Sequence, residues 1–417
     1  MTLSFLHGKP TNLFSRFTIG ALTLSSMAAS AADAGSFADD LSFLSEHTDV
    51  LVLQNDSGAA IAVAPDWQAR VVTSTWDSEQ GASMGWLNRP VIEQGVLDDE
   101  ARKGTNVEKI HAFGGEERFW IGPEAGQFGY YFAPGAEFTI DNWFTPHAID
   151  TEEYDVDLLQ DNTLTFSHTA HLTNHQGTLF NIGINRQVQL LDQDAYVSIF
   201  ELSDSFGVQS VGYSTTNTIQ NQGDFTWDKE TGMPSVWILG MYPASDTNLV
   251  YIPTKGEQLP AVNDSYFGKV SSDDLKVAKN GLTMVAHANK RIKIGIKEQD
   301  SLGLAAAYNS AQGTLTIIKY LPQEAPAGYV NSLWKKQDAP FSGDVINAYN
   351  DGPATPGSGQ LGKFFELESS SPAANLKAGD SLTHKQYTFH FHGEKSQLNK
   401  LSQTLLGVEL QQLENTF

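Results

Sequence analysis

The feature that most constrains the fold of this 417-residue chain is a long succession of short β-type segments with no helical segment between them. These segments are rich in β-branched and aromatic residues, and Gly, Pro, Asn and Asp turns separate them. The expected strands are residues 50–54, 59–64, 69–75, 128–132, 163–167, 179–191, 196–202, 236–241, 249–252, 292–296, 302–308, 314–320, 363–368 and 382–392. Such a pattern favours an antiparallel sandwich or barrel over a fold with alternating strands and helices.

Helices are expected only near the two ends of the chain. Ser36 can cap a short amphipathic helix whose apolar face carries Phe37, Leu41 and Leu44. A closing helix is expected over residues 396–413. No period repeats along the chain, and the Gly/Pro/Ser-rich segment 352–361 has β runs on both sides, so it is expected to be a loop.

The first 31 residues have the pattern of an export signal. Lys9 and Arg16 precede the apolar run 17–24, and Ala29-Ser30-Ala31 supplies a small-residue cleavage site. The apolar run is too short to cross a bilayer. We therefore expect residues 1–31 to be a signal peptide, residues 32–417 to be a single domain, and the mature protein to be periplasmic or secreted.

Charge and cysteine content exclude several classes of function. The chain has 26 Lys and Arg against 49 Asp and Glu, a formal charge of −23, which disfavours nucleic acid and anionic membranes as partners. An anionic polysaccharide would need a local basic cleft. The absence of cysteine excludes thiol catalysis and disulfides. No nucleotide, zinc or calcium motif is present, so no cofactor and no metal site is expected.

A pair of carboxylates in the segment 344–393 is the first candidate for chemistry. In the expected strand 363–368, the period of two places Glu366 and Glu368 on one face and Phe365 and Leu367 on the other. Carboxylates on an apolar strand are costly unless their face is wet or performs chemistry. A solvated outer face is the alternative explanation.

This segment also resembles a known family. Leu367-Glu368, Pro372, Leu376, Ala378-Gly379 and the alternating strand that follows are similar to the C-terminal signature of aldose 1-epimerases, the galactose mutarotases. The resemblance covers about fifty residues. It implies a galactose mutarotase-like β-supersandwich with a sugar bound in a groove on its concave sheet, and it implies that Glu368 is the general base.

A second segment, Thr215 to Gly223, is similar to the family's Thr-Asn-His-x-Tyr-Phe-Asn-Leu-Gly segment. The family's histidine, which protonates the ring oxygen, corresponds here to Thr218, which cannot donate a proton as an imidazolium does. The resemblance leaves Asn217 and Asn221 as ligands of sugar hydroxyls. Another histidine, His147 or His111, would then have to supply the acid.

Further candidates lie in polar and aromatic clusters. Between glycines, Glu116, Arg118 and Trp120 combine charge with an indole that can stack on a sugar ring. A surface ion-pair network with a core tryptophan is the alternative. Arg70 could reach the groove or be a solvated side chain. In the loop 143–147, Trp143 is a candidate sugar contact and His147 a candidate acid–base group, or an exposed structural histidine.

Together these features predict an exported, carbohydrate-active protein, most simply an aldose 1-epimerase-like isomerase acting by proton transfer. Glu368 and His147 would be catalytic. The substrate contacts would be Arg70, Glu116, Arg118, Trp120, Trp143, Asn217, Asn221 and Glu366. The ligand would be a mono-, oligo- or polysaccharide. A polysaccharide lyase or glycoside hydrolase on the same scaffold, and a non-catalytic glycan-binding protein, are the alternatives.

Overall fold

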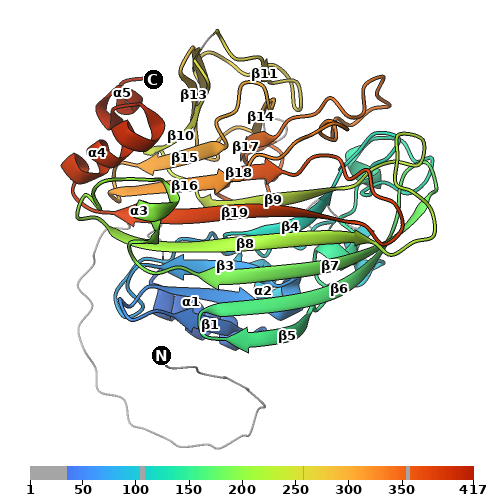
Figure 1. Ribbon diagram of the computed structural model, residues 1–417, viewed down its shortest axis with the longest axis horizontal. Helices are drawn as coiled ribbons and strands as arrows, with labels where there is room; N and C mark the ends of the chain where they lie inside the picture. Colours follow the sequence, from blue (N-terminus) through green and yellow to red (C-terminus); the bar gives the residue numbers. More distant parts are fainter. Residues whose placement is uncertain (1–34, 104–108, 257, 354–356) are drawn as a thin grey trace, which may run out of the picture.

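The computed structural model describes residues 35–103, 109–256, 258–353 and 357–417 (Figure 1). The predicted signal peptide lies outside these residues. The strands are β1 (Leu51–Gln54), β2 (Ala60–Ala64), β3 (Arg70–Thr75), β4 (Arg118–Gly122), β5 (Asp155–Gln160), β6 (Thr163–Thr173), β7 (Leu179–Leu190), β8 (Gln209–Asn221), β9 (Ser235–Pro243), β10 (Asn248–Pro253), β11 (Val262–Asn263), β12 (Leu275–Ala278), β13 (Gly281–Val285), β14 (Ile292–Ile296), β15 (Leu304–Asn309), β16 (Thr314–Tyr320), β17 (Ile346–Asn350), β18 (Phe364–Ser370) and β19 (Ser381–His392). The α-helices are α1 (Phe37–Ser45), α2 (Arg89–Gln94), α3 (Ala195–Ile199), α4 (Lys395–Leu406) and α5 (Leu410–Glu414), and the short 3-10 turns are η1 (Pro65–Trp67), η2 (Ala101–Lys103), η3 (Ile140–Asn142) and η4 (His147–Ile149).

Three antiparallel sheets contain the strands of the described residues. The large sheet has the order β12-β13-β10-β15-β16-β19-β8-β7-β6-β5, the second sheet has the order β11-β14-β17-β18-β9-β4, and β1-β2-β3 form the third. The long strands β19 and β8 run side by side through the large sheet (Figure 1). The predicted all-β architecture of large antiparallel sheets is therefore confirmed.

The second sheet packs one face against the large sheet. Phe365 and Leu367 of β18 lie in a buried cluster with Ile318 of β16 and Val250 of β10. The alternate residues of β18, Glu366 and Glu368, consequently face away from the sandwich interior, as the period of two predicts. This face of the second sheet is the floor of the site described below.

The two expected helical segments lie near the ends of the described chain, whereas the short helices α2 and α3 inside the chain were not predicted. The Ser36 side chain accepts a hydrogen bond from the backbone N–H of Asp39 and caps α1. The expected helix 396–413 is divided into α4 and α5, because Gly407 adopts the left-handed conformation at φ 68° and ends α4. These two helices pack on the outer side of the large sheet (Figure 1).

Two of the predicted strands are not strands in the structure. Residues 196–202 were expected to be a strand, but α3 occupies most of this stretch, and Tyr196 packs edge-to-face on Phe391 of β19 at 4.9 Å. Residues 128–132 form a loop whose aromatic side chains are nevertheless buried. In both stretches the aromatic residues anchor a connection to the core, so their high β-propensity does not indicate a ladder.

Within the described residues, none of the helices combines the length and the apolar character that a bilayer crossing requires.

Candidate functional site

A groove lies on the outward face of the second sheet, and strand register builds its floor. Arg118 of β4 is the Cα partner of Leu239 in β9, which is in turn the partner of Glu368 in β18. Two residues further along β4, on the same face, Trp120 pairs with Trp237 of β9. Because side chains of paired residues point to the same face, these residues share one floor although they come from distant parts of the sequence.

The groove encloses about 630 Å³ of space, part of it open to solvent. Loops over the sheet supply its walls, so aromatic rings line it together with charged groups. The lining residues are Ile110, Arg118, Trp120, Glu124, Trp143, Trp237, Leu239, Met241, Tyr266, Phe267, Arg291, Lys293, Trp334, Tyr349, Leu361, Phe364 and Glu366. An apolar lining with a few convergent polar groups is typical of a small-molecule site.

Glu366 and Arg118 form an ion pair on the groove floor. The guanidinium of Arg118 also lies over the Trp120 ring, 4.7 Å from its centre, which fixes its orientation. Burial raises the pKa of Glu366 to about 7, and the nearby Glu368 carboxylate adds to this rise although Arg118 opposes it. Glu366 can therefore be protonated or ionised at neutral pH.

Glu368 lies below the groove surface and is fully buried. Its Oε2 accepts hydrogen bonds from the Trp237 indole N–H at 2.9 Å and from the Lys293 ammonium at 3.0 Å. Its Oε1 has no hydrogen-bond partner among the described residues. One oxygen of this buried carboxyl group is therefore held by two donors and the other is left without one.

A smaller pocket continues from the groove beside Lys293. It shares Trp237, Tyr266 and Lys293 with the groove and is also lined by Ser235 and Asp344. Within the described part of the chain, the Ser235 hydroxyl and one Asp344 carboxylate oxygen are buried without a hydrogen-bond partner. Buried polar atoms of this kind are rare in native proteins, and a bound polar ligand would satisfy them.

Glu124 adds a third carboxyl group to the groove wall. Burial raises its pKa, and the charges of Lys293 and Arg291 oppose the rise. Its backbone N–H donates to the Ser332 hydroxyl at 3.1 Å, which ties this loop to the loop that carries Trp334. The two loops on the groove wall are thereby held together.

Comparison with known proteins places the chain in a family. Residues 35–417 match the model of a family of unknown function, DUF6786. The chain belongs to the DUF6786 family. No curated protein matches its sequence.

Several solved structures resemble this family member. The Slr1438 protein from Synechocystis sp. PCC 6803 is 12% identical with a TM-score of 0.49, and the match covers 83% of this chain and 96% of that protein. A galactose mutarotase-like protein from Lactobacillus casei ATCC 334 is 10% identical with a TM-score of 0.47, covering 82% and 100%. A galactose mutarotase related enzyme from Lactobacillus acidophilus is 7% identical with a TM-score of 0.45, covering 82% and 97%.

The structure brings five of the predicted site residues of this DUF6786 protein together. Arg118, Trp120, Trp143 and Glu366 line the groove, and Glu368 lies directly beneath it. Arg118, Trp120 and Glu366 converge because the register of β4, β9 and β18 places them on one face, and Trp143 joins them from a loop.

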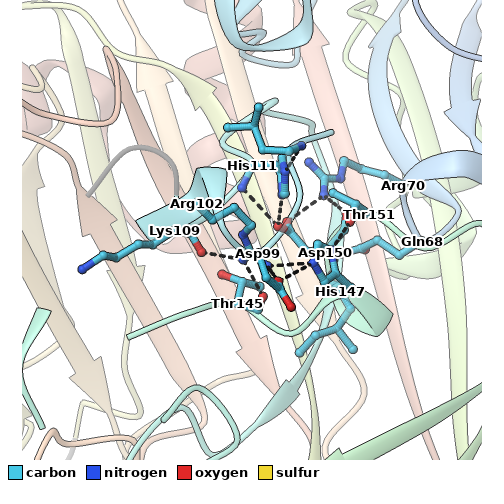
Figure 2. A network of polar contacts seen from close by, with 12 residues as sticks. Gln68, Arg70, Asp99, Arg102, Lys109, His111, Thr145, His147, Asp150 and Thr151 are labelled. Atoms are coloured by element: carbon cyan, nitrogen blue, oxygen red, sulfur yellow. Dashed lines mark hydrogen bonds and ion pairs between the residues drawn. The ribbon is translucent and has the colours of Figure 1, made fainter. Parts of the chain in front are cut away.

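His147 does not reach the groove. It lies in a separate polar network, in which Nε2 is 2.9 Å from Asp99 and Nδ1 is 2.8 Å from the Thr151 hydroxyl (Figure 2). The hydrogen bond from His147 lowers the pKa of Asp99. His111, the other histidine considered, pairs with buried Asp150 at 3.0 Å in the same network. Both rings are therefore held by structural partners.

Arg70 is a structural residue of this same network and not a groove residue. Its side chain is fully buried and donates to the backbone carbonyls of Gly114 at 2.7 Å and Asp150 at 3.1 Å (Figure 2). Burial lowers its pKa to about 9. The alternation along β3 points Arg70 at these loops. No feature of the sequence indicated that Arg70 binds loop carbonyls and not a substrate.

Glu116, Asn217 and Asn221 also lie outside the groove. Glu116 is buried between the sheets, where it contacts His390 and accepts from the Ser74 hydroxyl at 2.7 Å. Asn217 accepts from Arg186 in the same interior, and the Asn221 side chain donates to the Leu376 carbonyl at 3.0 Å. All three satisfy internal polar groups, so the structure does not bring them together with the groove residues as predicted.

The segment that carries Thr218 lies on another surface. Thr218 hydrogen-bonds to Thr383 across β8 and β19 at 2.7 Å, and it lines a shallow trough on the outer face of the large sheet. The described residues that line the groove include no histidine. The imidazole acid expected from the family resemblance is thus missing from the groove.

Sequence reasoning missed a second group of groove residues. Trp237 and Lys293 lie within strands that were predicted, but no motif singled them out, while Glu124, Tyr266, Arg291 and Trp334 lie in loops or at a strand end. The usable signal was the period of two in the strand 292–296, where Lys293 interrupts an apolar run. A buried lysine needs a partner, and Glu368 is that partner.

Proposed function

We propose that the groove binds a sugar and interconverts its anomers, as an aldose 1-epimerase-like isomerase. The observation that carries this proposal is the pair of carboxyl groups on one strand at the groove floor. Glu366 lines the groove and can hold a proton at neutral pH, and Glu368, buried directly beneath the floor, has one carboxylate oxygen without a hydrogen-bond partner among the described residues and the other bonded to an ammonium group. These are the two states that a general acid and a general base require.

Four tryptophans support sugar binding. Trp120, Trp143, Trp237 and Trp334 all line the groove, and the first three are more than nine-tenths buried. Within the described residues, the indole nitrogens of Trp120 and Trp143 have no hydrogen-bond partner. Indole faces stack on the C–H faces of sugar rings, and free indole N–H groups can donate to hydroxyl oxygens.

The proposed reaction is a proton exchange across the sugar ring. The free oxygen of Glu368 accepts the proton of the anomeric hydroxyl, and Glu366 donates a proton to the ring oxygen as the bond from that oxygen to the anomeric carbon breaks. The open-chain aldehyde rotates about its first carbon–carbon bond and recloses, and both protons return. Glu366 and Glu368 lie two residues apart, roughly 7 Å along the strand, so both can reach one ring.

This scheme gives Glu366 the role that the sequence resemblance assigned to a histidine. Arg118 pairs with Glu366 when that group is ionised and so stabilises it after it has donated its proton. The lyase alternative depended on Arg70 and His147, and neither side chain lines the groove. This geometry gives that alternative no support.

Two-dimensional ¹H NMR exchange spectroscopy, which measures interconversion of α and β anomers, tests the proposal on a panel of aldoses. The wild-type protein should exchange α and β anomers of at least one sugar faster than the spontaneous rate, and Glu368→Gln should lower the added rate roughly 10²–10⁴-fold. Glu93→Gln, on the exposed side of α2, is the matched control and should leave the rate unchanged. An absence of added exchange with every aldose would refute the isomerase.

A non-catalytic glycan-binding protein is the second candidate. It is favoured by the fact that both carboxyl groups are already ion-paired, Glu366 with Arg118 and Glu368 with Lys293. The same NMR experiment separates the two functions. Saturable line broadening of a sugar without anomer exchange would assign binding alone.

We also propose that the protein is exported to the periplasm or secreted, on the strength of the charged, apolar and small-residue pattern of residues 1–31. Cell fractionation and the intact mass of the mature chain test this. A mature mass that starts near Ala32 supports export, and a cytoplasmic protein that retains Met1 contradicts it.

A further inference from the structure

Arg291 differs from the other cations of the groove. Arg118 and Lys293 each pair with a carboxylate on the groove floor. Arg291, the residue directly before β14, has no ion pair and no hydrogen bond to any described residue, and its Nε is buried without a partner. The guanidinium lies over the Phe267 ring, 4.0 Å from its centre. The side chain is therefore held in place while its hydrogen-bonding capacity stays unused.

The acidic groups nearest Arg291 are occupied elsewhere. One carboxylate oxygen of Asp351 accepts from the Tyr349 hydroxyl at 2.6 Å and the other from the Gly362 N–H at 2.8 Å. Burial raises the pKa of Asp351 and of Glu124, and the charge of Arg291 opposes both rises. Neither carboxyl group forms an ion pair or a hydrogen bond with Arg291 among the described residues.

The groove gathers three cations in an acidic protein. The chain carries a formal charge of −23, yet Arg118, Arg291 and Lys293 all line this one groove. Arg118 and Lys293 are paired with Glu366 and Glu368, which leaves Arg291 as the cation without an ion pair among the described residues. An acidic surface would repel an anionic ligand, so a local cluster of cations is needed to bind one. A guanidinium also matches the planar, two-oxygen geometry of carboxylate and sulfate groups.

We propose that the sugar bound in the groove carries an anionic substituent, a carboxylate or sulfate, and that Arg291 binds this group. The inference rests on the proposed sugar function and adds the substrate class to it. The ring of Phe267 holds the guanidinium in position, and the indoles of the groove hold the sugar ring. Arg291 is thus a residue that determines specificity, and it takes no part in the proton exchange.

Titration calorimetry with charged and neutral sugars tests this. The charged probes are glucuronate, galacturonate and glucose 6-sulfate. Each is compared at the same low salt concentration with its neutral parent sugar, glucose or galactose. Wild-type protein should bind at least one charged sugar roughly 10–100-fold more tightly than its neutral partner. Arg291→Gln should remove this preference and leave the affinity for neutral sugars unchanged. Comparison of uronate with sulfate identifies which group is bound.

Two further variants sharpen the result. Arg291→Lys keeps the charge but loses the two-pronged contact, so it should keep only part of the preference. Lys400→Gln removes an exposed charge on α4 and should change nothing. Equal affinity for charged and neutral sugars would overturn the role of Arg291 and leave the sugar site intact. No binding of any sugar, charged or neutral, would overturn the proposed function itself.

Discussion

At the scale of single residues, the site depends on how burial tunes two neighbouring carboxyl groups on β18. Glu366 is buried against an arginine, and Glu368 is buried against a lysine and an indole. Burial lets Glu366 hold a proton at neutral pH, whereas Glu368 accepts hydrogen bonds from the Lys293 ammonium and the Trp237 indole. The same residue type can thereby supply both an acid and a base.

The pH dependence of anomer exchange follows from Glu366. Its pKa is about 7, so the protonated acid is lost as the pH rises above 7. We expect the rate of the wild-type protein to fall by up to about tenfold for each further pH unit. In Glu366→Gln this decline should be absent and the rate low throughout. A wild-type rate that rises steadily from pH 7 to 9 would exclude Glu366 as the acid.

The same group affects stability. The pKa of Glu366 in the folded protein lies above its ordinary value of 4.5, so the folded state binds more protons than the unfolded state between pH 4.5 and about 7. Its contribution to stability is present at low pH and is lost as the pH rises through this window. At 1.36 kcal/mol per pKa unit the loss is at most about 3 kcal/mol. Urea denaturation of wild type and Glu366→Gln at pH 5 and pH 8 measures this loss as a change in the difference between their free energies of unfolding. The same difference at both pH values would contradict the predicted loss.

At the scale of elements, β18 is the strand that joins the core to the site. Its inward residues pack against the large sheet and its outward residues form the groove floor. The period of two alone gave this division correctly, because alternation is a local property of an extended backbone. The sequence could not indicate which strands lie next to β18. Its pairing with β17 is local, but its pairing with β9 joins residues more than a hundred positions apart.

The errors at the element scale have a common cause. Arg70, Glu116 and Asn217 were expected to contact a ligand, and each instead satisfies polar groups in the interior or the loops. A polar residue on a β-strand has the same local pattern whether it faces a groove or a buried network. Only the partner across the sheets decides between them, and that partner is distant in sequence.

Replacement of Leu367 tests the division of β18. Leu367 is fully buried on the inward face, so Leu367→Ala should lower the free energy of unfolding by roughly 2–5 kcal/mol. Leu302→Ala is the control, because Leu302 is 48% exposed and its loss should cost less than about 0.5 kcal/mol. Urea denaturation measures both. An equal loss in the two variants would mean that Leu367 does not face the core.

At the scale of the whole molecule, a polar network joins the large sheet to the second sheet. Arg186 of β7 pairs with Glu117 at 3.0 Å, and Gln386 of β19 donates to the other oxygen of Glu117 at 3.2 Å. Ser369 of β18 in turn donates to Gln386 at 2.7 Å. Because β18 carries the groove carboxylates on its other face, this network sets the position of the groove floor relative to the large sheet.

Removal of one member of this network should be costly. Glu117→Leu leaves the buried Arg186 without its ion-pair partner and should lower stability by roughly 3–5 kcal/mol. The double variant Glu117→Leu with Arg186→Met should recover most of that loss, since no charge remains unpaired. Lys395→Gln, which breaks an exposed ion pair with Glu414, should cost at most about 1 kcal/mol. A double variant as unstable as the single one would contradict this account of the interior.

The most direct test of the central claim is a crystal structure of the protein with the sugar that binds most tightly in the calorimetric panel. We predict density for the sugar ring in the groove, in contact with Trp120 and Trp143, with its anomeric hydroxyl within about 3 Å of a Glu368 carboxylate oxygen. Density for the sugar in the outer trough beside Thr218, with the groove unoccupied, would contradict the assignment of the site.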